Sequence, residues 1–165
     1  MRLYLILLFI RELCCLYGTE EDIKTENVVT VFSWAKQQIN RCTGTVYKNN
    51  FVITAAHCCR DALKVQVITG TQNLSESVLS QNFIPVTKIF THPSYNAQKS
   101  AFLLPGTFDL AVLVLGNPIL SENPVTIKQY TGEEELFIMG TGHVRSPRGY
   151  PDFPRKTPIR QASNM

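Results

Sequence analysis

Short apolar runs alternate with polar stretches along most of this chain. One run, Phe51–Thr54, has a β-branched centre, and residues 63–70 alternate between polar and apolar positions up to a closing glycine. A third run, residues 84–90, contains Pro85, which suits an edge strand because proline has no N–H to donate to a neighbouring strand. Runs of this length and residue type predict strands, so the pattern indicates an all-β fold.

A polar turn links two of these predicted strands. Residues 48–50 read Lys-Asn-Asn and lie between residues 42–47 and Phe51–Thr54. A short polar connection between two strand patterns is typical of a β-hairpin. We therefore expect residues 42–54 to form one.

The strand predicted over residues 109–115 opens with a carboxylate and is otherwise wholly apolar. A buried carboxylate without a partner costs several kcal/mol, so Asp109 requires hydrogen-bond donors. Backbone N–H groups at the start of the strand would suffice. A side-chain partner is the alternative, and it would make Asp109 a candidate functional residue.

The N-terminus has the pattern of an export signal. A basic start is followed by an apolar stretch over residues 3–10, a charged pair, and a second apolar piece that ends near Gly18. This is too short for a membrane span, which needs about 20 apolar residues. We predict a signal peptide over residues 1–18, a short pro-segment or loose arm over 19–27, and an extracellular, secreted protein. The alternative is a buried N-terminal strand in a cytosolic protein.

Composition narrows the class of protein. The 165 residues suit one domain, or one and a piece, and 44% apolar with 18% charged residues describe a chain that forms a globular core. The net charge of +3 is too small to indicate a nucleic-acid partner. We predict neither a nucleic-acid nor a membrane partner, and no cofactor.

A histidine follows the Phe51–Thr54 run directly, in the sequence F-V-I-T-A-A-H-C-C. The string T-A-A-H-C around His57 resembles the histidine segment of the chymotrypsin/trypsin family of serine proteases. The strings H-P-S-Y-N, beginning at His92, and D-L-A-V, beginning at Asp109, resemble two further segments of that family. For His92 we favour a surface turn residue with no role in chemistry.

The resemblance implies a chymotrypsin-like Greek-key β-barrel. The first barrel would be complete over residues 28–120, whereas residues 121–165 would be a linker and the incomplete start of a second barrel. In this family the histidine is the general base and the aspartate orients it. The resemblance thus implies that His57 and Asp109, which are 52 residues apart, are catalytic residues and neighbours in space.

Two of the departures from the family pattern are threonines. Residues 42–47 resemble the family's C-G-G-S-L-I strand, with Thr43 in place of the first glycine. Residues 136–142 resemble a strand that ends in G-W-G, with Thr141 in place of the tryptophan.

Five cysteines support an extracellular compartment. Two of them, Cys14 and Cys15, would leave with the signal. In the resembled family, the cysteine after the histidine pairs with one about sixteen residues upstream, which implies a Cys42–Cys58 disulfide. Cys59 is left over, as a free thiol, a link to another chain, or a competitor with Cys58 for Cys42.

The residue Asn73 begins the sequon Asn-Leu-Ser and is therefore a candidate glycosylation site if the chain is secreted.

The family's nucleophile lies in a G-D-S-G-G segment, which these 165 residues do not contain. The candidate serines Ser121, Ser146 and Ser163 have no flanking glycines to build a tight nucleophile turn. The sequence therefore predicts a secreted trypsin-like serine endopeptidase family protein with the histidine and aspartate but without the serine, inactive as given.

A binding module and a metal site are the two alternatives to this function. A non-catalytic protease homologue could bind proteases, inhibitors or other secreted proteins through the barrel face that an incomplete second barrel leaves exposed. A metal site would draw on His57, Cys58 or Cys59, with His92 or His143. We predict no metal site, because its ligands would be adjacent in sequence and Cys58 is already assigned to the disulfide.

Overall fold

The computed structural model describes residues 21–22, 25–36, 38–70, 73–97, 108–122, 125–129, 137–141 and 155–158, with only the backbone described for 21–22 and 155–158. The predicted signal peptide, residues 1–18, lies outside these ranges. So do His143, Ser146 and Ser163.

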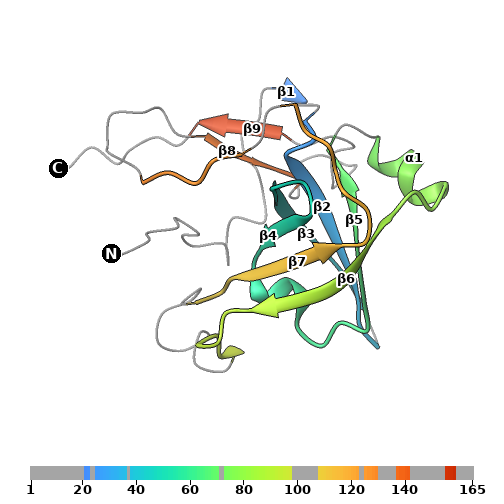
Figure 1. The fold of residues 1–165 in the computed structure, drawn as a ribbon. Helices are drawn as coiled ribbons and strands as arrows, with labels where there is room; N and C mark the ends of the chain where they lie inside the picture. The colour runs from blue at the N-terminus through green and yellow to red at the C-terminus, as the bar shows by residue number, and fades with distance from the viewer. Residues whose placement is uncertain are drawn as a thin grey trace.

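Strands make up nearly all of the described regular structure, and they form two separate groups (Figure 1). In chain order the elements are β1 (Glu21–Asp22), β2 (Val28–Trp34), β3 (Ile39–Tyr47), β4 (Phe51–Thr54), the 3-10 turn η1 (Ala56–Cys59), β5 (Lys64–Thr69), α1 (Leu74–Leu79), β6 (Ile84–Thr91), β7 (Ala111–Leu115), β8 (Phe137–Gly140) and β9 (Arg155–Pro158). No helix within the described ranges has the length and apolar character to cross a membrane. The predicted all-β class is confirmed.

Six strands close into an antiparallel barrel in the order β2-β3-β4-β7-β6-β5, and β5 returns to β2. The predicted hairpin is formed by β3 and β4, with Val46 opposite Val52. Strand β4 also pairs with β7, so Thr54 at the end of β4 lies opposite Ala111 at the start of β7. This pairing brings the residues after β4 and before β7 to the same rim of the barrel.

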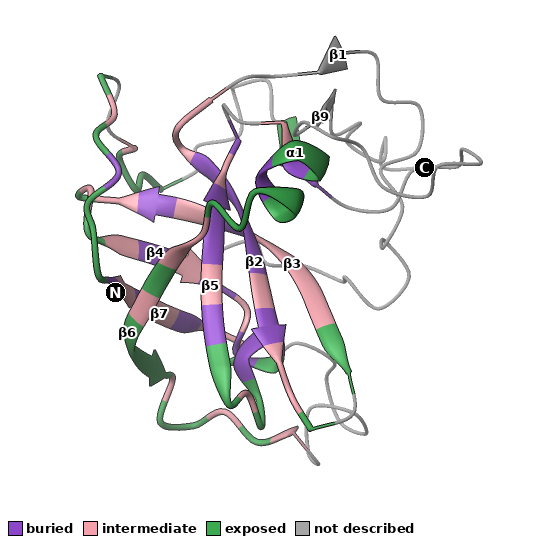
Figure 2. Cartoon of the chain, turned by 90° about the vertical axis from the view of Figure 1, so that its right-hand side faces the viewer, coloured by how far each residue is buried: buried purple, intermediate pink, exposed green. Residues whose placement is uncertain are grey.

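Branched apolar side chains from five of the six strands fill the barrel. The core contains Val29, Val31, Val46, Val52, Val65, Val67, Leu113 and Leu115, all of them buried. In Figure 2 the buried positions concentrate on β2, β5 and β7, while α1 and much of β6 are exposed. Side chains fill the interior of small barrels, so this barrel has a packed core.

A glycine in β3 makes room for this core. A Cβ atom on Gly44 would lie 2.5 Å from Cγ1 of Val52 and 3.0 Å from Cγ2 of Val31. Strands β2, β3 and β4 therefore approach one another inside the barrel in a way that a side chain at position 44 would prevent.

The barrel is weakest between β5 and β6, where only Gln66 with Pro85 and Val67 with Ile84 are in register. Beyond these pairs the strands separate around a cavity of about 220 Å³, lined by residues 62–66 and 85–89. The predicted edge position of the proline strand is wrong, because β6 pairs with β5 on one side and β7 on the other. A closed barrel has no edge, and Pro85 instead lies where the two strands begin to part.

Strands β1, β9 and β8 form a second, three-stranded sheet beside the barrel. Threonines connect it to the barrel: the Thr141 N–H donates to Oγ1 of Thr43 (3.1 Å), and the Thr30 hydroxyl donates to Oγ1 of Thr141 (3.0 Å). A Cβ atom on Gly140 would lie 2.8 Å from the Thr43 Oγ1. The residue after β8 is thus held directly against β2 and β3.

Candidate active site

The imidazole of His57 projects from the short turn η1 at the end of β4. Ala56 and Cys58, on either side of it, are buried, whereas the His57 side chain is 52% exposed. The turn is anchored to β2, because the Ser33 hydroxyl donates to the Cys58 carbonyl over 2.6 Å. Small buried neighbours and this anchor fix the backbone of His57 while leaving its ring at the surface.

The carboxylate of Asp109 lies opposite, just before β7, and makes two contacts with the same residue. Its Oδ2 is 2.6 Å from Nδ1 of His57, and its Oδ1 accepts the backbone N–H of His57 over 2.8 Å. Both donors therefore belong to His57, the neighbour that the family resemblance implied. The Asp109 side chain is only 16% exposed, so these donors provide the pairing that burial requires.

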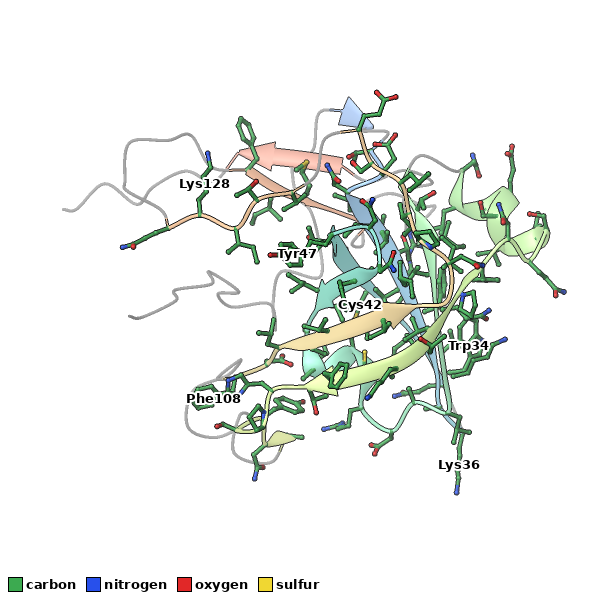
Figure 3. The ribbon with its side chains drawn as sticks, viewed as in Figure 1. Trp34, Lys36, Cys42, Tyr47, Phe108 and Lys128 are labelled. Atoms are coloured by element: carbon green, nitrogen blue, oxygen red, sulfur yellow. A yellow bond between two sulfur atoms is a disulfide. The ribbon has the colours of Figure 1, made fainter. Side chains whose placement is uncertain are left out.

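An aromatic contact supports the backbone before Asp109. Phe108 has a positive φ of 56°, which is rare for a residue with a bulky side chain. Its ring stacks on the imidazole of His92 with the ring centres 4.8 Å apart. Figure 3 shows Phe108 at the start of β7, on the opposite side of the barrel from Trp34. Sequence reasoning missed this contact, since no local pattern marks a positive φ at a phenylalanine.

Electrostatics keep the Asp109 carboxyl ionised. Partial burial raises its pKa, but the hydrogen bonds from the His57 side chain and backbone, the field of His57 and a bond from the Ala56 backbone outweigh burial and lower the pKa below its ordinary value. A carboxylate can only accept, so Nδ1 of His57 carries the hydrogen of the 2.6 Å contact. In neutral His57 the lone pair is then on Nε2.

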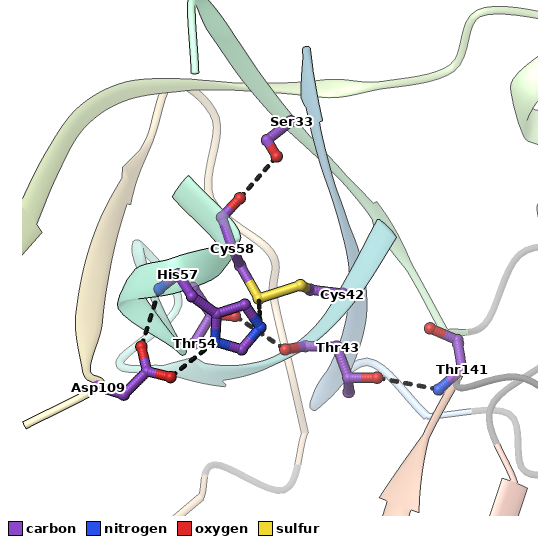
Figure 4. The surroundings of a disulfide bond; sticks show 8 residues. All are labelled: Ser33, Cys42, Thr43, Thr54, His57, Cys58, Asp109 and Thr141. Carbon is purple, nitrogen blue, oxygen red and sulfur yellow. Dashed lines mark hydrogen bonds and ion pairs between the residues drawn. A yellow bond between two sulfur atoms is a disulfide. The ribbon is translucent and has the colours of Figure 1, made fainter. Parts of the chain in front are cut away.

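The disulfide joins Cys42 to Cys58, with the Cα atoms 6.2 Å apart, and lies directly against the His57 ring (Figure 4). Nε2 of His57 is 3.4 Å from Sγ of Cys58. Cys59 is a buried free thiol, and burial together with the charge of Asp109 raises its pKa to about 11. The intermolecular disulfide considered for Cys59 stays a prediction, and it would require this side chain to leave its buried position.

Among the described residues, Cys42, His57 and Cys58 place one potential metal-ligand atom each within 4.8 Å of one another. Both sulfur atoms are bonded to each other, and metals bind the thiolate form of cysteine. The oxidised site therefore offers a metal only the imidazole.

Other candidate residues have different surroundings. His92 is half-buried in a turn, where its Nδ1 accepts the N–H of Ser94 over 3.1 Å. The Ser121 hydroxyl donates to Oδ1 of Asn27 over 2.9 Å. Asn73 precedes α1, and its Oδ1 accepts the N–H of Glu76 over 3.0 Å, as a helix N-cap does.

A family model described as trypsin matches residues 21–164, most of the chain. The chain belongs to the trypsin family. The resemblance seen in the sequence is thereby confirmed, and it extends well beyond the histidine and aspartate segments that first indicated it.

The curated relatives of this trypsin-family chain have several different names. Chymotrypsin-like elastase family member 1 of Rattus norvegicus is 30% identical over 112 residues, which cover 64% of this chain and 41% of the relative. Granzyme B of Homo sapiens is 38% identical over 63 residues, or 38% of this chain and 25% of the relative. Coagulation factor IX of Cavia porcellus is 31% identical, covering 62% of this chain and 36% of the relative. The chain thus spans less than half the length of these relatives.

Solved structures agree with the barrel. A structure of GrC superimposes with a TM-score of 0.68 at 21% identity, over 87% of this chain and 64% of that one. Neuropsin, a serine protease expressed in the limbic system of mouse brain, gives a TM-score of 0.64 at 22% identity, over 87% and 63%. At these identities the likeness shows a shared fold.

Proposed function

We propose that this trypsin-family chain carries the general-base half of a serine endopeptidase site, with His57 as the base and Asp109 as the residue that orients it. The observation that carries the proposal is the double contact of Asp109, to Nδ1 of His57 over 2.6 Å and to its backbone N–H over 2.8 Å. This contact sets both the tautomer and the direction of the ring.

In this role Nε2 of His57 would accept the proton of an attacking serine hydroxyl, and Asp109 would stabilise the imidazolium that forms. The 52% exposed ring and its free Nε2 lone pair support that step. The peptide bond then breaks only if a nucleophile and oxyanion donors stand at the same place.

We further propose that the 165-residue polypeptide by itself does not hydrolyse peptides. Its sequence has no G-D-S-G-G segment, and the Ser121 hydroxyl is engaged with Asn27. A base and its orienter without nucleophile or oxyanion donors lack elements whose loss costs many orders of magnitude in rate.

The proposed lack of peptide hydrolysis can be tested with purified chain. The chain is incubated with fluorogenic peptides, some ending in an arginyl residue and others in an apolar residue. We expect equal background signals from the native chain and from the His57→Ala variant. Turnover that His57→Ala abolishes would contradict inactivity while supporting the base role.

The base role itself can be tested without turnover. The Nδ1 proton of His57 should give a slowly exchanging, low-field proton resonance in the native chain, because it lies in a short charge-assisted hydrogen bond. Asp109→Ala should remove that resonance, whereas Asp61→Ala, at an exposed carboxylate, should leave it. A native chain without the resonance would contradict the oriented tautomer.

We also propose that the chain is extracellular and glycosylated at Asn73. The apolar N-terminal segment, the Cys42–Cys58 bridge and the sequon support this. The Asn73 amide nitrogen is the attachment atom, and the helix cap uses the other atom, Oδ1.

The chain expressed in animal cells should accumulate in the medium and lose mass on treatment with an N-glycosidase. The Ser75→Ala variant should not lose mass on that treatment. Chain that stays in the lysate would argue against secretion.

A second candidate function is protein binding without catalysis. Exposed apolar side chains support it: Ile127 before β8, and Phe137, Ile138 and Met139 within it. Immobilised chain can be tested against serine endopeptidases and their protein inhibitors. We expect Ile138→Ser to weaken binding and Leu79→Ser, at an exposed position on α1, to leave it unchanged. Equal effects of the two substitutions would rule out this face.

A further inference from the structure

The second nitrogen of the His57 ring faces the disulfide. Nδ1 is held by Asp109, and Nε2, on the other side of the same ring, is 3.4 Å from Sγ of Cys58 (Figure 4). The order in space is therefore carboxylate, imidazole, sulfur. In the serine endopeptidase role this sulfur takes no part, so the contact is unused there.

Thiol–disulfide exchange is a reaction that such an arrangement can assist. An attacking thiolate bonds to one sulfur, and the other sulfur departs with the electron pair of the broken S–S bond. Departure is faster when the leaving thiolate is stabilised, and a neighbouring imidazolium does this by its charge and by giving a proton.

The two sulfur atoms are not equivalent in this respect. Cys58 is 3% exposed and lies beside His57, whereas Cys42 is only partly buried. Cys42 is thus the sulfur that an incoming thiol can reach, and Cys58 is the sulfur that His57 can stabilise as it leaves.

We propose that Cys42–Cys58 is a redox-active disulfide and that His57 assists its reduction by thiols. The thiolate attacks Sγ of Cys42, the S–S bond breaks, and Cys58 takes the electron pair and a proton from Nε2 of protonated His57. A second thiolate attacks the outer sulfur of the mixed disulfide and releases Cys42. Two thiols are thereby oxidised to one disulfide, and Cys42 and Cys58 are reduced.

The neighbouring thiol does not compete in this exchange. Burial and the charge of Asp109 raise the pKa of Cys59 to about 11, so almost none of it is thiolate at neutral pH. Since the thiolate is the attacking form, Cys59 leaves the Cys42–Cys58 bond intact.

Several groups contribute to the field around His57. Asp109 holds the ring, and the buried Cys59 follows in the same turn. The Tyr95 phenol lies in the field of Asp109. Burial, and to a lesser extent the charge of Asp109, raises the pKa of Tyr95. Arg60 and Asp61, which end the turn, pair with each other over 3.5 Å.

The test measures reduction of the native full-length chain by reduced glutathione, followed by alkylation and peptide mapping of Cys42 and Cys58. At a fixed pH we expect His57→Gln to be reduced at least about a hundredfold more slowly than the native chain, the low end of what general acid–base assistance contributes. Asp109→Asn should slow reduction in the same direction.

The direction separates chemistry from unfolding, because a destabilised variant would expose its disulfide and be reduced faster. Arg60→Gln is the matched control: it removes a positive charge from the same turn without removing the proton donor, and its rate should stay within about twofold of native. Equal rates for native and His57→Gln, or an equal slowing by Arg60→Gln, would each overturn the proposal. Peptide hydrolysis is not a readout, so this result is independent of the proposed peptidase role.

Discussion

At the scale of single residues, the site depends on Asp109 satisfying two donors of His57 at once. The lowered pKa of Asp109 means that folding favours its ionised form. A group of this kind stabilises the fold above the pKa it has in the unfolded chain. That contribution is lost as pH falls through its lower folded value.

We predict that Asp109→Asn lowers the free energy of unfolding at pH 7 by about 1.5–3 kcal/mol, as expected for a hydrogen bond to a charged group. The difference from the native chain should begin to narrow below about pH 4, the ordinary pKa that Asp109 has in the unfolded chain. It should disappear once the pH falls below the lower folded pKa, where the native Asp109 is protonated as well. Denaturant unfolding over a pH series measures this.

The control for this prediction is Asp61→Asn, at a carboxylate that is 84% exposed. It should change stability little at any pH. A constant difference between native and Asp109→Asn down to pH 2 would contradict the linkage.

At the scale of elements, the residue that follows β8, Thr141, is held to the barrel by polar contacts with two other threonines. Thr43 and Thr141, each of which departs from the family pattern, contact each other through the Thr141 N–H, and Thr30 donates to the Thr141 hydroxyl. Their contact shows that they belong to one interface.

We predict that Thr141→Val lowers the free energy of unfolding by about 1–3 kcal/mol, because the buried Thr30 hydroxyl loses its acceptor. Thr141→Ser keeps the hydroxyl and should recover most of the loss. Chemical denaturation of the three proteins measures this, and equal destabilisation by valine and serine would point to lost methyl packing instead.

At the scale of the whole molecule, closure of the barrel decides where the chemistry lies. Antiparallel pairing of β4 with β7 places η1, the turn after β4, beside Asp109, which lies just before β7. The same closure packs β2, β3 and β4 tightly around Gly44, so the core and the rim depend on one another.

We predict that Gly44→Ala destabilises the barrel by about 1–3 kcal/mol, the usual cost of overpacking a core, since the new methyl group would overlap Val52 and Val31. Thermal unfolding followed by circular dichroism measures this. Asn50→Ala, in the exposed turn between β3 and β4, is the control and should unfold close to the native temperature. A Gly44→Ala variant as stable as native would show that the strands can move apart at little cost.

Much of this architecture could be predicted from the sequence. The alternation over residues 63–70, the hairpin around residues 48–50 and the apolar strand after Asp109 are local patterns, and local patterns report strand periodicity directly. The family strings indicated that His57 and Asp109 are neighbours. The edge position predicted from Pro85 is wrong because the missing N–H of a proline marks a gap in strand pairing, and such a gap also occurs inside a closed barrel where β5 and β6 part.

By itself, then, the sequence determined the class of the fold, its family and the residue types available at the rim. Only the tertiary structure decided that Asp109 contacts both the ring and the backbone of His57, that Nε2 faces Cys58, and that Thr141 meets Thr43. The physical reason is that most of these contacts join residues far apart in the sequence, and a sequence separation does not tell how a side chain is oriented. His57 and Cys58 are adjacent, but adjacency does not tell which way the imidazole ring points either. Their geometry is set by the closure of β4 on β7 and by the turn that β4 leads into.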